Sequence, residues 1–278
     1  MAKAKHENLS YNQGLYTANI LMQRFYFPEE YYDLKYFWDE CKDEIISSLV
    51  KPQKWTLVHM WLEFYSDISE ELYTTKKNLD TPDYFEVLKD VLLDTDLIPN
   101  IPEPIFENKE CSSLYPCVED DCELCQVMID WEKHVDSNIK EINKNIVHSA
   151  FQIMFSNRRF MHDFNLELSN LIEEDIDYIC ENSPETLTKG KIKRNTYWPV
   201  WLKEALLYRD KGTCVLCRKS ITGQYSISTD LEIDHIVPLN LFGTNDASNF
   251  QLLCKKCNTT KQGLSSASNA INVPFWNI

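Results

Sequence analysis

Glycine is scarce in this chain and almost missing from its first two thirds. The 278 residues include six glycines, and only Gly14 precedes residue 190. A region of that length with a single glycine has little use for tight turns, which favours long helices over hairpins. Long apolar runs are also lacking: none approaches the ~18 residues that a membrane helix needs, so we predict no membrane partner.

The beginning of the chain lacks the features of a secretory signal. Residues 1–7 are followed by no short apolar run and no cleavage site of small residues, so we expect a cytoplasmic protein. In that reducing compartment the ten cysteines are better suited to binding metal than to forming disulfides. Hydrophobic residues make up 44% of the chain, which is too many for a disordered protein.

Basic side chains are in short supply, with 28 Lys and Arg against 43 Asp and Glu and a net charge of −15. The shortage is confined to the part before residue 196, because the residues from there on contain eight basic but only six acidic side chains. An acidic region repels phosphate backbones, so any nucleic-acid contact should lie at the C-terminal end. We expect the acidic part to regulate the protein or to bind a regulatory protein partner.

Apolar side chains recur at three- and four-residue steps through most of the first 185 residues. Pro28 opens such a run to about residue 50, and Pro52 and Pro82 begin two more. The prolines at 99, 102 and 104 indicate a loop, and residues 123–180 again have a mostly helical pattern. We therefore predict a mainly α protein, with an α-helical domain over residues 1–185, a basic linker over 186–196 and a small α+β domain over 197–278.

The predicted linker has no apolar period but carries several basic side chains. Two interpretations stay open for Lys189, Lys191, Lys193 and Arg194. They could contact phosphates, or they could belong to a solvated hinge, which is the commoner outcome for a run of charge.

Two Cys-x-x-Cys pairs lie in the C-terminal part, Cys214 with Cys217 and Cys254 with Cys257. Each pair presents two thiolates at a spacing that suits one tetrahedral zinc ion. A domain of about 80 residues has little core of its own, so a bound metal would also stabilise it. The alternative is that the four thiols are free and buried.

A second group of cysteines is less regular. It consists of Cys111, Cys117, Cys122 and Cys125, of which only the last two form a Cys-x-x-Cys pair. These residues could bind a second structural zinc, or they could be ordinary reduced cysteines of a loop and a helix.

Apolar and polar side chains alternate between the two C-terminal cysteine pairs, from Leu231 to about Pro238, and this period of two indicates a strand. A turn-rich loop at residues 243–249 and an apolar stretch at 250–253 predict a returning strand, which a helix follows. Asp234 and His235 are neighbours, so on a regular strand they point to opposite faces. A local turn or bulge would be needed to aim both at one substrate.

This order of residues resembles the zinc-stapled HNH endonucleases. The matching string covers about residues 197–265 and reads Cys-x-x-Cys, then Asp-His-x-x-Pro-Leu, then Gly-Thr-Asn-Asp-x-x-Asn-x-Gln-Leu-Leu-Cys-x-x-Cys-Asn-x-x-Lys. The resemblance implies a β-hairpin followed by a helix that together grip one catalytic metal ion, the ββα-metal fold. It leaves residues 1–185 without a recognised family.

The resemblance also implies roles for individual residues. His235 matches the general base that activates water, and Asn249 matches the residue that orients this histidine and braces the hairpin. Asp234 and Asn258 match ligands of the catalytic divalent ion. Asn258 stands where the family name has its second histidine, and its neutral amide oxygen favours magnesium or manganese.

The chemistry of phosphodiester hydrolysis independently requires a base that titrates near neutrality and a cation that balances the charge of the transition state. Lys261, one turn after Asn258, could hold a flanking phosphate, and Lys255 and Lys256 are further candidates for contacts with the nucleic-acid backbone. No group is recognisably arranged to read base edges, so we expect low sequence specificity.

Three functions are consistent with these features. We predict an endonuclease that acts on DNA, and analogy with chains of this build suggests bacterial defence against phage, or restriction-like cleavage, under the control of the helical domain. An RNA-cleaving nuclease or toxin is an alternative, since no feature distinguishes the two substrates. A non-catalytic zinc module that binds nucleic acid would need only the cysteines, so the residues that match catalytic positions argue against it.

Overall fold

The computed structural model describes residues 10–28, 31–106, 122–221, 231–263, 265, 266 and 268. It is mostly helical, with a small strand-and-helix region near the C-terminal end, as the sequence predicts. The chain divides into two compact units, one formed by residues 1–21 and 62–151 and the other by residues 22–61 and 152–278. None of the helices among the described residues has the length and apolar character to cross a membrane.

The first unit is built from helices. These are α4 (Ile68–Asn78), α5 (Thr81–Asp94), the first part of α1 (Tyr11–Tyr26), the end of α3 (Leu57–Tyr65) and most of α6 (Glu123–Ser156). Asp67 and Asp80 accept hydrogen bonds from backbone N–H groups in the first turns of α4 and α5, so both helices begin with a side-chain cap. The core joins α4, α5 and α6, with the ring of Trp131 packed edge-on against Phe85.

Most of the negative charge of the chain belongs to the first unit. Residues 62–151 contain 21 of the 43 acidic side chains but only seven of the 28 basic ones. The other residues are close to neutral as a group, with 22 acidic and 21 basic side chains. The acidity that the sequence places before residue 196 is therefore concentrated in one compact unit.

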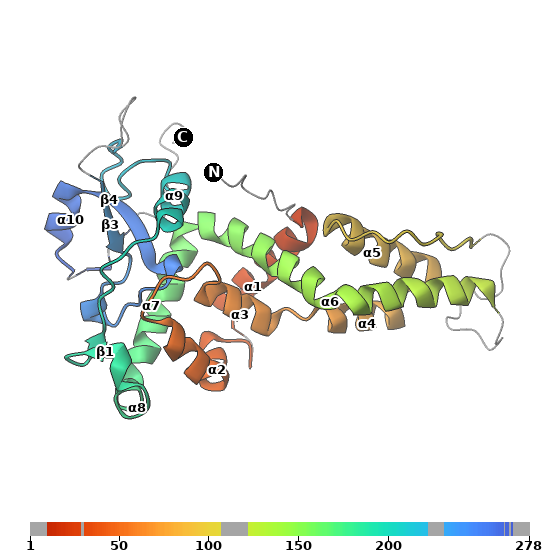
Figure 1. Cartoon of the computed structure of the whole chain (residues 1–278), viewed down its shortest axis with the longest axis horizontal. Helices are drawn as coiled ribbons and strands as arrows, with labels where there is room; N and C mark the ends of the chain where they lie inside the picture. The colour runs from red at the N-terminus through yellow and green to blue at the C-terminus, as the bar shows by residue number, and fades with distance from the viewer. Residues whose placement is uncertain are drawn as a thin grey trace. The chain divides into compact units, whose positions relative to one another are not determined.

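The second unit combines helical segments from the N-terminal region with all of the C-terminal region. Its helices among the described residues include α2 (Leu34–Ser48), α7 (Arg158–Glu174), α8 (Ile176–Asn182), α9 (Val200–Arg209) and α10 (Lys255–Lys261) (Figure 1). Its strands are β1 (Leu187–Thr188), β2 (Lys191–Ile192), β3 (Leu231–His235) and β4 (Phe250–Cys254). Short 3-10 helices are η2 (Pro184–Thr186), η3 (Leu239–Leu241) and η4 (Ala247–Asn249).

A cluster of aromatic rings forms the helical core of the second unit. Asn157 separates α6 from α7, and its side chain caps α7 by accepting from the N–H of Phe160 at 3.1 Å. The apolar face of α7 then brings Phe160 and Phe164 against Phe25 and Trp61, with ring centroids 5.1–6.1 Å apart. Because these residues come from three distant parts of the sequence, the cluster ties residues 22–61 to α7.

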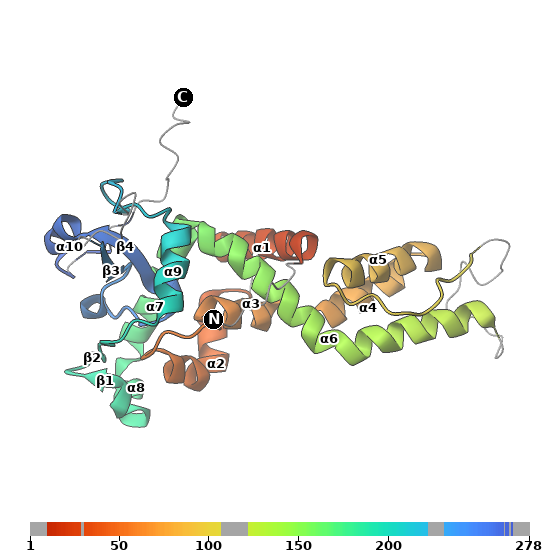
Figure 2. The same cartoon turned by 45° about the horizontal axis from the view of Figure 1, so that its top comes forward.

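A strand–strand–helix arrangement forms the C-terminal part of the second unit. β3 and β4 are antiparallel and pair without interruption from Leu231 with Cys254 to His235 with Phe250. β4 is buried along its length, and α10 follows it directly. α9 lies beside β4 in both views (Figures 1 and 2). This is the β-hairpin and helix that the resemblance implies.

Residues 186–196, predicted from the sequence as a basic linker, contain a short hairpin. β1 and β2 form a hairpin whose turn residues, Lys189 and Gly190, have φ of 54° and 71°, the left-handed values that suit a two-residue turn. Ile192 is buried, so the segment is fastened to the second unit. The strands are two residues long, which is too short for a period of two to be seen in the sequence.

The boundaries of the two compact units also differ from the predicted domain boundary at residue 185. Residues 22–61 and 152–196 belong with the C-terminal residues, because they pack together as one unit. Independent folding of residues 197–278 stays a prediction.

Removing Phe164 should destabilise the protein strongly. Phe164→Ala deletes a fully buried ring, and such substitutions lower the free energy of unfolding by about 3–5 kcal/mol. Phe27→Ala is the matched control, because this side chain is 79% exposed and its loss should change the free energy of unfolding by less than ~0.5 kcal/mol. Urea denaturation followed by circular dichroism would measure both, and equal destabilisation would contradict the core described above.

Candidate functional site

Four cysteine sulfurs converge beside the β3–β4 hairpin. The Sγ atoms of Cys214, Cys217, Cys254 and Cys257 all lie within 4.8 Å of one another, and those of Cys217 and Cys254 are 3.8 Å apart. Zn–S bonds of ~2.3 Å at tetrahedral angles put two thiolates about 3.8 Å apart. The donor set and its spacing therefore fit one structural zinc ion, as the sequence predicts.

The second cysteine group falls partly outside the described residues. Cys111 and Cys117 are not among them, while Cys122 precedes α6 and Cys125 lies buried in its first turn. Within the described part of the chain, the four C-terminal cysteines are the one group of three or more His, Cys, Asp or Glu side chains with metal-ligand spacing. The second zinc site stays a prediction.

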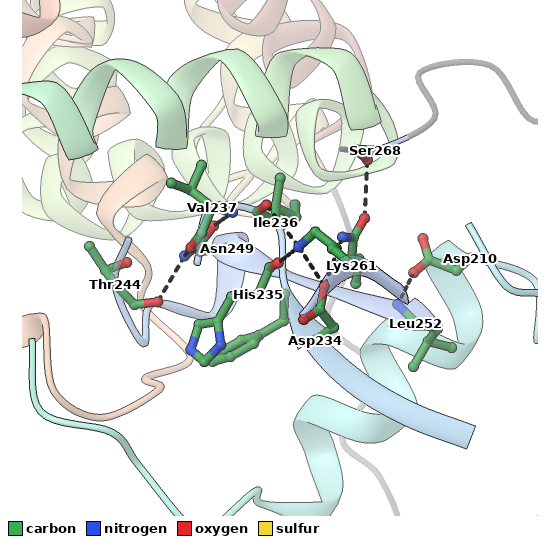
Figure 3. A network of polar contacts seen from close by, with 12 residues as sticks. Asp210, Asp234, His235, Ile236, Val237, Thr244, Asn249, Leu252, Lys261 and Ser268 are labelled. Atoms are coloured by element: carbon green, nitrogen blue, oxygen red, sulfur yellow. Dashed lines mark hydrogen bonds and ion pairs between the residues drawn. The ribbon is translucent and has the colours of Figure 1, made fainter. Parts of the chain in front are cut away.

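A buried ion pair fastens α9 to β4. The Arg209 guanidinium donates to both carboxylate oxygens of Asp210, at 2.8 and 3.0 Å, and to the backbone carbonyl of Phe250 at 2.7 Å. Asp210 accepts in turn from the N–H of Leu252 at 3.0 Å (Figure 3). Two neighbouring opposite charges at the end of a helix are usually solvated, so this role could not be predicted from the sequence.

Asp234 faces α10 and is bonded to a lysine of that helix. Its Oδ2 accepts from the Lys261 ammonium at 2.6 Å (Figure 3). The same oxygen accepts from the Gln251 amide at 3.1 Å. The same ammonium donates to the backbone carbonyls of His235 and Ile236. The pKa of Lys261 is lowered, because the effect of burial outweighs the charge of Asp234 and the hydrogen bond to it, which both raise the pKa.

This position of Lys261 corrects the contact that we predicted from the sequence. Helix spacing alone allows Lys261 to reach a flanking phosphate, but the structure buries it at 6% exposure. The reason is that α10 packs this face onto β3, where three oxygen atoms surround the ammonium. Lys261 is therefore an internal partner of Asp234.

His235 and Asp234 leave β3 on opposite faces. The strand pairing runs regularly through both residues, Asp234 with Gln251 and His235 with Phe250, and successive side chains of a regular strand alternate. The turn or bulge that would aim both at one side is not present at these positions. Figure 3 shows Asp234 directed toward Lys261 and the His235 ring directed away from it.

The His235 imidazole is enclosed by aromatic rings and one amide. The ring centroids of Phe250 and Trp198 lie 4.7 and 6.0 Å from it, and its Nε2 is 3.1 Å from Oδ1 of Asn245. Burial lowers the pKa of His235 to about 4, although the hydrogen bond to Asn245 and the charge of Asp234 oppose this. The imidazole is therefore neutral at physiological pH, the form that can accept a proton, but it is a weaker base than the near-neutral one that the sequence analysis expects.

Asn249 holds the backbone that follows His235. Its Oδ1 accepts from the N–H of Val237 at 2.8 Å, and its Nδ2 donates to the carbonyls of Val237 and Thr244, each at 2.9 Å (Figure 3). These bonds brace the hairpin. The amide that contacts the His235 ring itself is that of Asn245. This residue belongs to the Gly-Thr-Asn-Asp stretch, but the sequence pattern alone does not distinguish it from its neighbours.

Asn258 lies half-buried on α10, three residues before Lys261. Among the described residues its side chain forms no hydrogen bond, and Oδ1 of Asp234 likewise has none. Both side chains therefore keep an oxygen for a cation. Carboxylate and amide oxygens are ligands that magnesium and manganese prefer, so the donor chemistry fits a hard divalent ion.

Three exposed lysines lie beside the cysteine cluster. Lys219, Lys255 and Lys256 line an open pocket there, together with residues of both cysteine pairs. Their positive charge suits a phosphate backbone. Of the basic residues in the predicted linker, Lys191 has its ammonium 3.1 Å from the centroid of the Phe242 ring, so it packs on the protein in a cation–π contact.

Comparison with known proteins identifies the C-terminal region. The family model of the HNH endonucleases matches residues 214–263. The matched segment contains the four clustered cysteines, both strands of the β3–β4 hairpin and α10, so an HNH endonuclease domain is present and the resemblance is confirmed. The N-terminal part matches no family model. No curated protein and no solved structure matches the chain.

Replacing Cys257 by serine should remove the zinc ion. The wild type should contain one zinc per chain, and the variant should lose it together with more than ~4 kcal/mol of unfolding free energy. Cys180→Ser is the matched control, because Cys180 is an exposed thiol of α8 outside the cluster. Elemental analysis and thermal denaturation would check this, and full zinc content in the Cys257 variant would refute the site.

Proposed function

We propose that this protein is a metal-dependent HNH-type endonuclease that hydrolyses phosphodiester bonds in DNA. The observation that supports the proposal is that one hairpin and its following helix carry a buried neutral histidine and two side chains with oxygen donors, Asp234 and Asn258, within the segment that matches the HNH family. A module that only binds nucleic acid would need the cysteines but none of these three side chains.

In this proposal each residue has a distinct task, and the substrate has to reach both sides of β3, because Asp234 and His235 point to opposite faces of the strand. His235 takes a proton from the attacking water, which its neutral imidazole can do. Asp234 and Asn258 would hold a magnesium or manganese ion, and that ion would stabilise the charge of the transition state and of the departing oxygen. Asn249 keeps the backbone after His235 in place through its bonds to Val237.

The proposed substrate contacts do not read sequence. Lys219, Lys255 and Lys256 are exposed and can bind a phosphate backbone, which gives affinity without base specificity. We therefore expect cleavage at many sequences. RNA offers the same phosphate charge and is compared in the test below.

Plasmid DNA incubated with the full chain and magnesium or manganese should be nicked or linearised. His235→Ala should lower the cleavage rate by ~10²–10⁴-fold, the usual contribution of a general base, and EDTA should abolish cleavage. His162→Ala is the matched control. His162 also neighbours an aspartate, with its Nδ1 2.8 Å from Asp163, but it lies on α7 outside the HNH segment and its loss should leave the rate unchanged.

The same gel would carry single-stranded and structured RNA. Cleavage of RNA alone would replace DNA as the substrate, while binding without cleavage of either would favour the non-catalytic zinc module. Wild-type rates in the His235 variant would contradict its role as the base.

We also propose that the acidic first unit weakens, without abolishing, nucleic-acid binding by the full chain, and that a regulatory protein relieves this effect, as suits a defence or restriction-like effector. Support comes from the excess of acidic side chains in residues 62–151. Negative charge of this density repels phosphate backbones and lowers the rate at which they approach.

Neutralising exposed acids of the first unit should therefore tighten DNA binding at low salt, and the gain should disappear at high salt because surface charges are screened. The test variant combines Glu63→Gln, Glu70→Gln and Glu86→Gln, which are exposed. The matched control removes three exposed acids of the second unit, with Glu173→Gln, Glu174→Gln and Glu181→Gln. Fluorescence anisotropy with a labelled duplex would compare them, and an equal gain in both would show that the location of the charge does not matter.

A further inference from the structure

The Asn245 side chain is enclosed in the second unit and bonded through both of its polar atoms. The residue is fully buried. Its Nδ2 donates to the backbone carbonyl of Lys193 at 2.8 Å, and its Oδ1 is 3.1 Å from Nε2 of His235. Its own backbone N–H donates to the carbonyl of Leu49 at 2.9 Å. The residue is thereby tied to the end of α2 and to the segment that follows β2.

The bond to Lys193 determines which way the Asn245 amide faces. A carbonyl oxygen can only accept, so the amide nitrogen must face Lys193 and the amide oxygen must face His235. That oxygen also can only accept, so Nε2 of His235 must carry a proton. In a neutral imidazole the lone pair then belongs to the other ring nitrogen, Nδ1.

Other polar groups near His235 do not compete for this role. The Asn249 amide is bonded to the backbone of Val237 and Thr244. Within the described residues Nδ1 of His235 has no hydrogen-bond partner, and the ring otherwise contacts aromatic side chains. Asn245 is therefore the group that can select between the two neutral forms of the ring.

We infer that Asn245 is a positioning residue that fixes His235 as its Nε2-protonated tautomer, so that Nδ1 is the atom that accepts the proton. The inference rests on the proposed nuclease function. In the hydrolysis, Nδ1 takes a proton from water while the water oxygen forms a bond to phosphorus. The bond from phosphorus to the leaving oxygen breaks, that oxygen takes a proton from solvent, and the imidazolium then returns its proton to solvent.

The tautomer of the wild-type protein can be measured without any assay of cleavage. Nitrogen NMR on the zinc-loaded full chain with isotope-labelled histidine would report the protonation of each ring nitrogen at neutral pH. The chain has six histidines, and the resonances lost in His235→Ala identify His235. We expect a protonated Nε2 and an unprotonated Nδ1. A ring protonated on Nδ1 alone would overturn the inference.

Two variants of Asn245 separate positioning from simple bracing of the loop. Asn245→Asp and Asn245→Ala both lose the donor to Lys193, but the aspartate keeps an oxygen for His235. We expect the alanine variant to cleave ~10²-fold more slowly or worse, and its His235 ring to populate both neutral tautomers. We expect the aspartate variant to keep the Nε2-protonated tautomer and about a tenth of the wild-type cleavage rate or more. Equal tautomer populations in the two variants would overturn the inference.

Asn165→Ala controls for damage to the loop alone. Asn165 is buried, and its Nδ2 donates to the Ser248 hydroxyl at 3.2 Å, so the variant loosens the same loop away from His235. The Asn165→Ala variant should have a lower melting temperature and keep the wild-type tautomer of His235. A change of tautomer like the one expected for Asn245→Ala would overturn the inference. Zinc content and circular dichroism would confirm folding. A wild type that cuts neither DNA nor RNA would refute the nuclease, and the NMR result would still decide the tautomer.

Discussion

The antiparallel pairing of β3 with β4 is the constraint on which the candidate site depends. The register places Asp234 toward α10 and His235 toward the aromatic rings on the other face, and a shift by one residue would exchange the two faces. β4 is held at its end by the cysteine cluster, through Cys254, and along its length by the buried pair of Arg209 and Asp210. The zinc site and the ion pair therefore stabilise the register of the hairpin as well as the fold.

The loop between the strands is shaped by side chains and by neighbouring helices. A Cβ at position 243 would collide with the carbonyl of Val237, so glycine is required where the backbone approaches itself. Asp246 is buried and accepts from the N–H of Ser248 at 2.9 Å and from the N–H of Leu57, at the start of α3, at 3.0 Å. Residues far from the HNH segment in sequence thus help to set the loop that carries Asn245.

Features that depend on the spacing of residues along the chain could be predicted from the sequence, and features that depend on contacts between distant residues could not. The zinc cysteines, the strand–strand–helix order and the presence of helices after Pro28, Pro52 and Thr81 follow from spacing along the chain. The predicted starts were wrong for two of these helices, because α2 begins only at Leu34 and α3 only at Leu57, whereas Pro82 does lie in the first turn of α5. α1 and α4 were not predicted individually, because no proline marks their starts and their apolar faces are short. The direction of Lys261 depends on which face α10 packs onto β3, and the contact of Asn245 with His235 depends on carbonyls of Leu49 and Lys193, which no short motif contains.

The bonds from Asn245 to two main-chain carbonyls constrain the path of the backbone, not the chemistry of the side chains that it carries. The side chain of Lys193 is exposed, so its type can vary while its carbonyl still meets the amide. Leu49 is buried and needs only to stay apolar. Insertion or deletion of one residue near either position would move the carbonyl away. The α2–α3 connection and the segment after β2 should therefore tolerate changes of composition much better than changes of length.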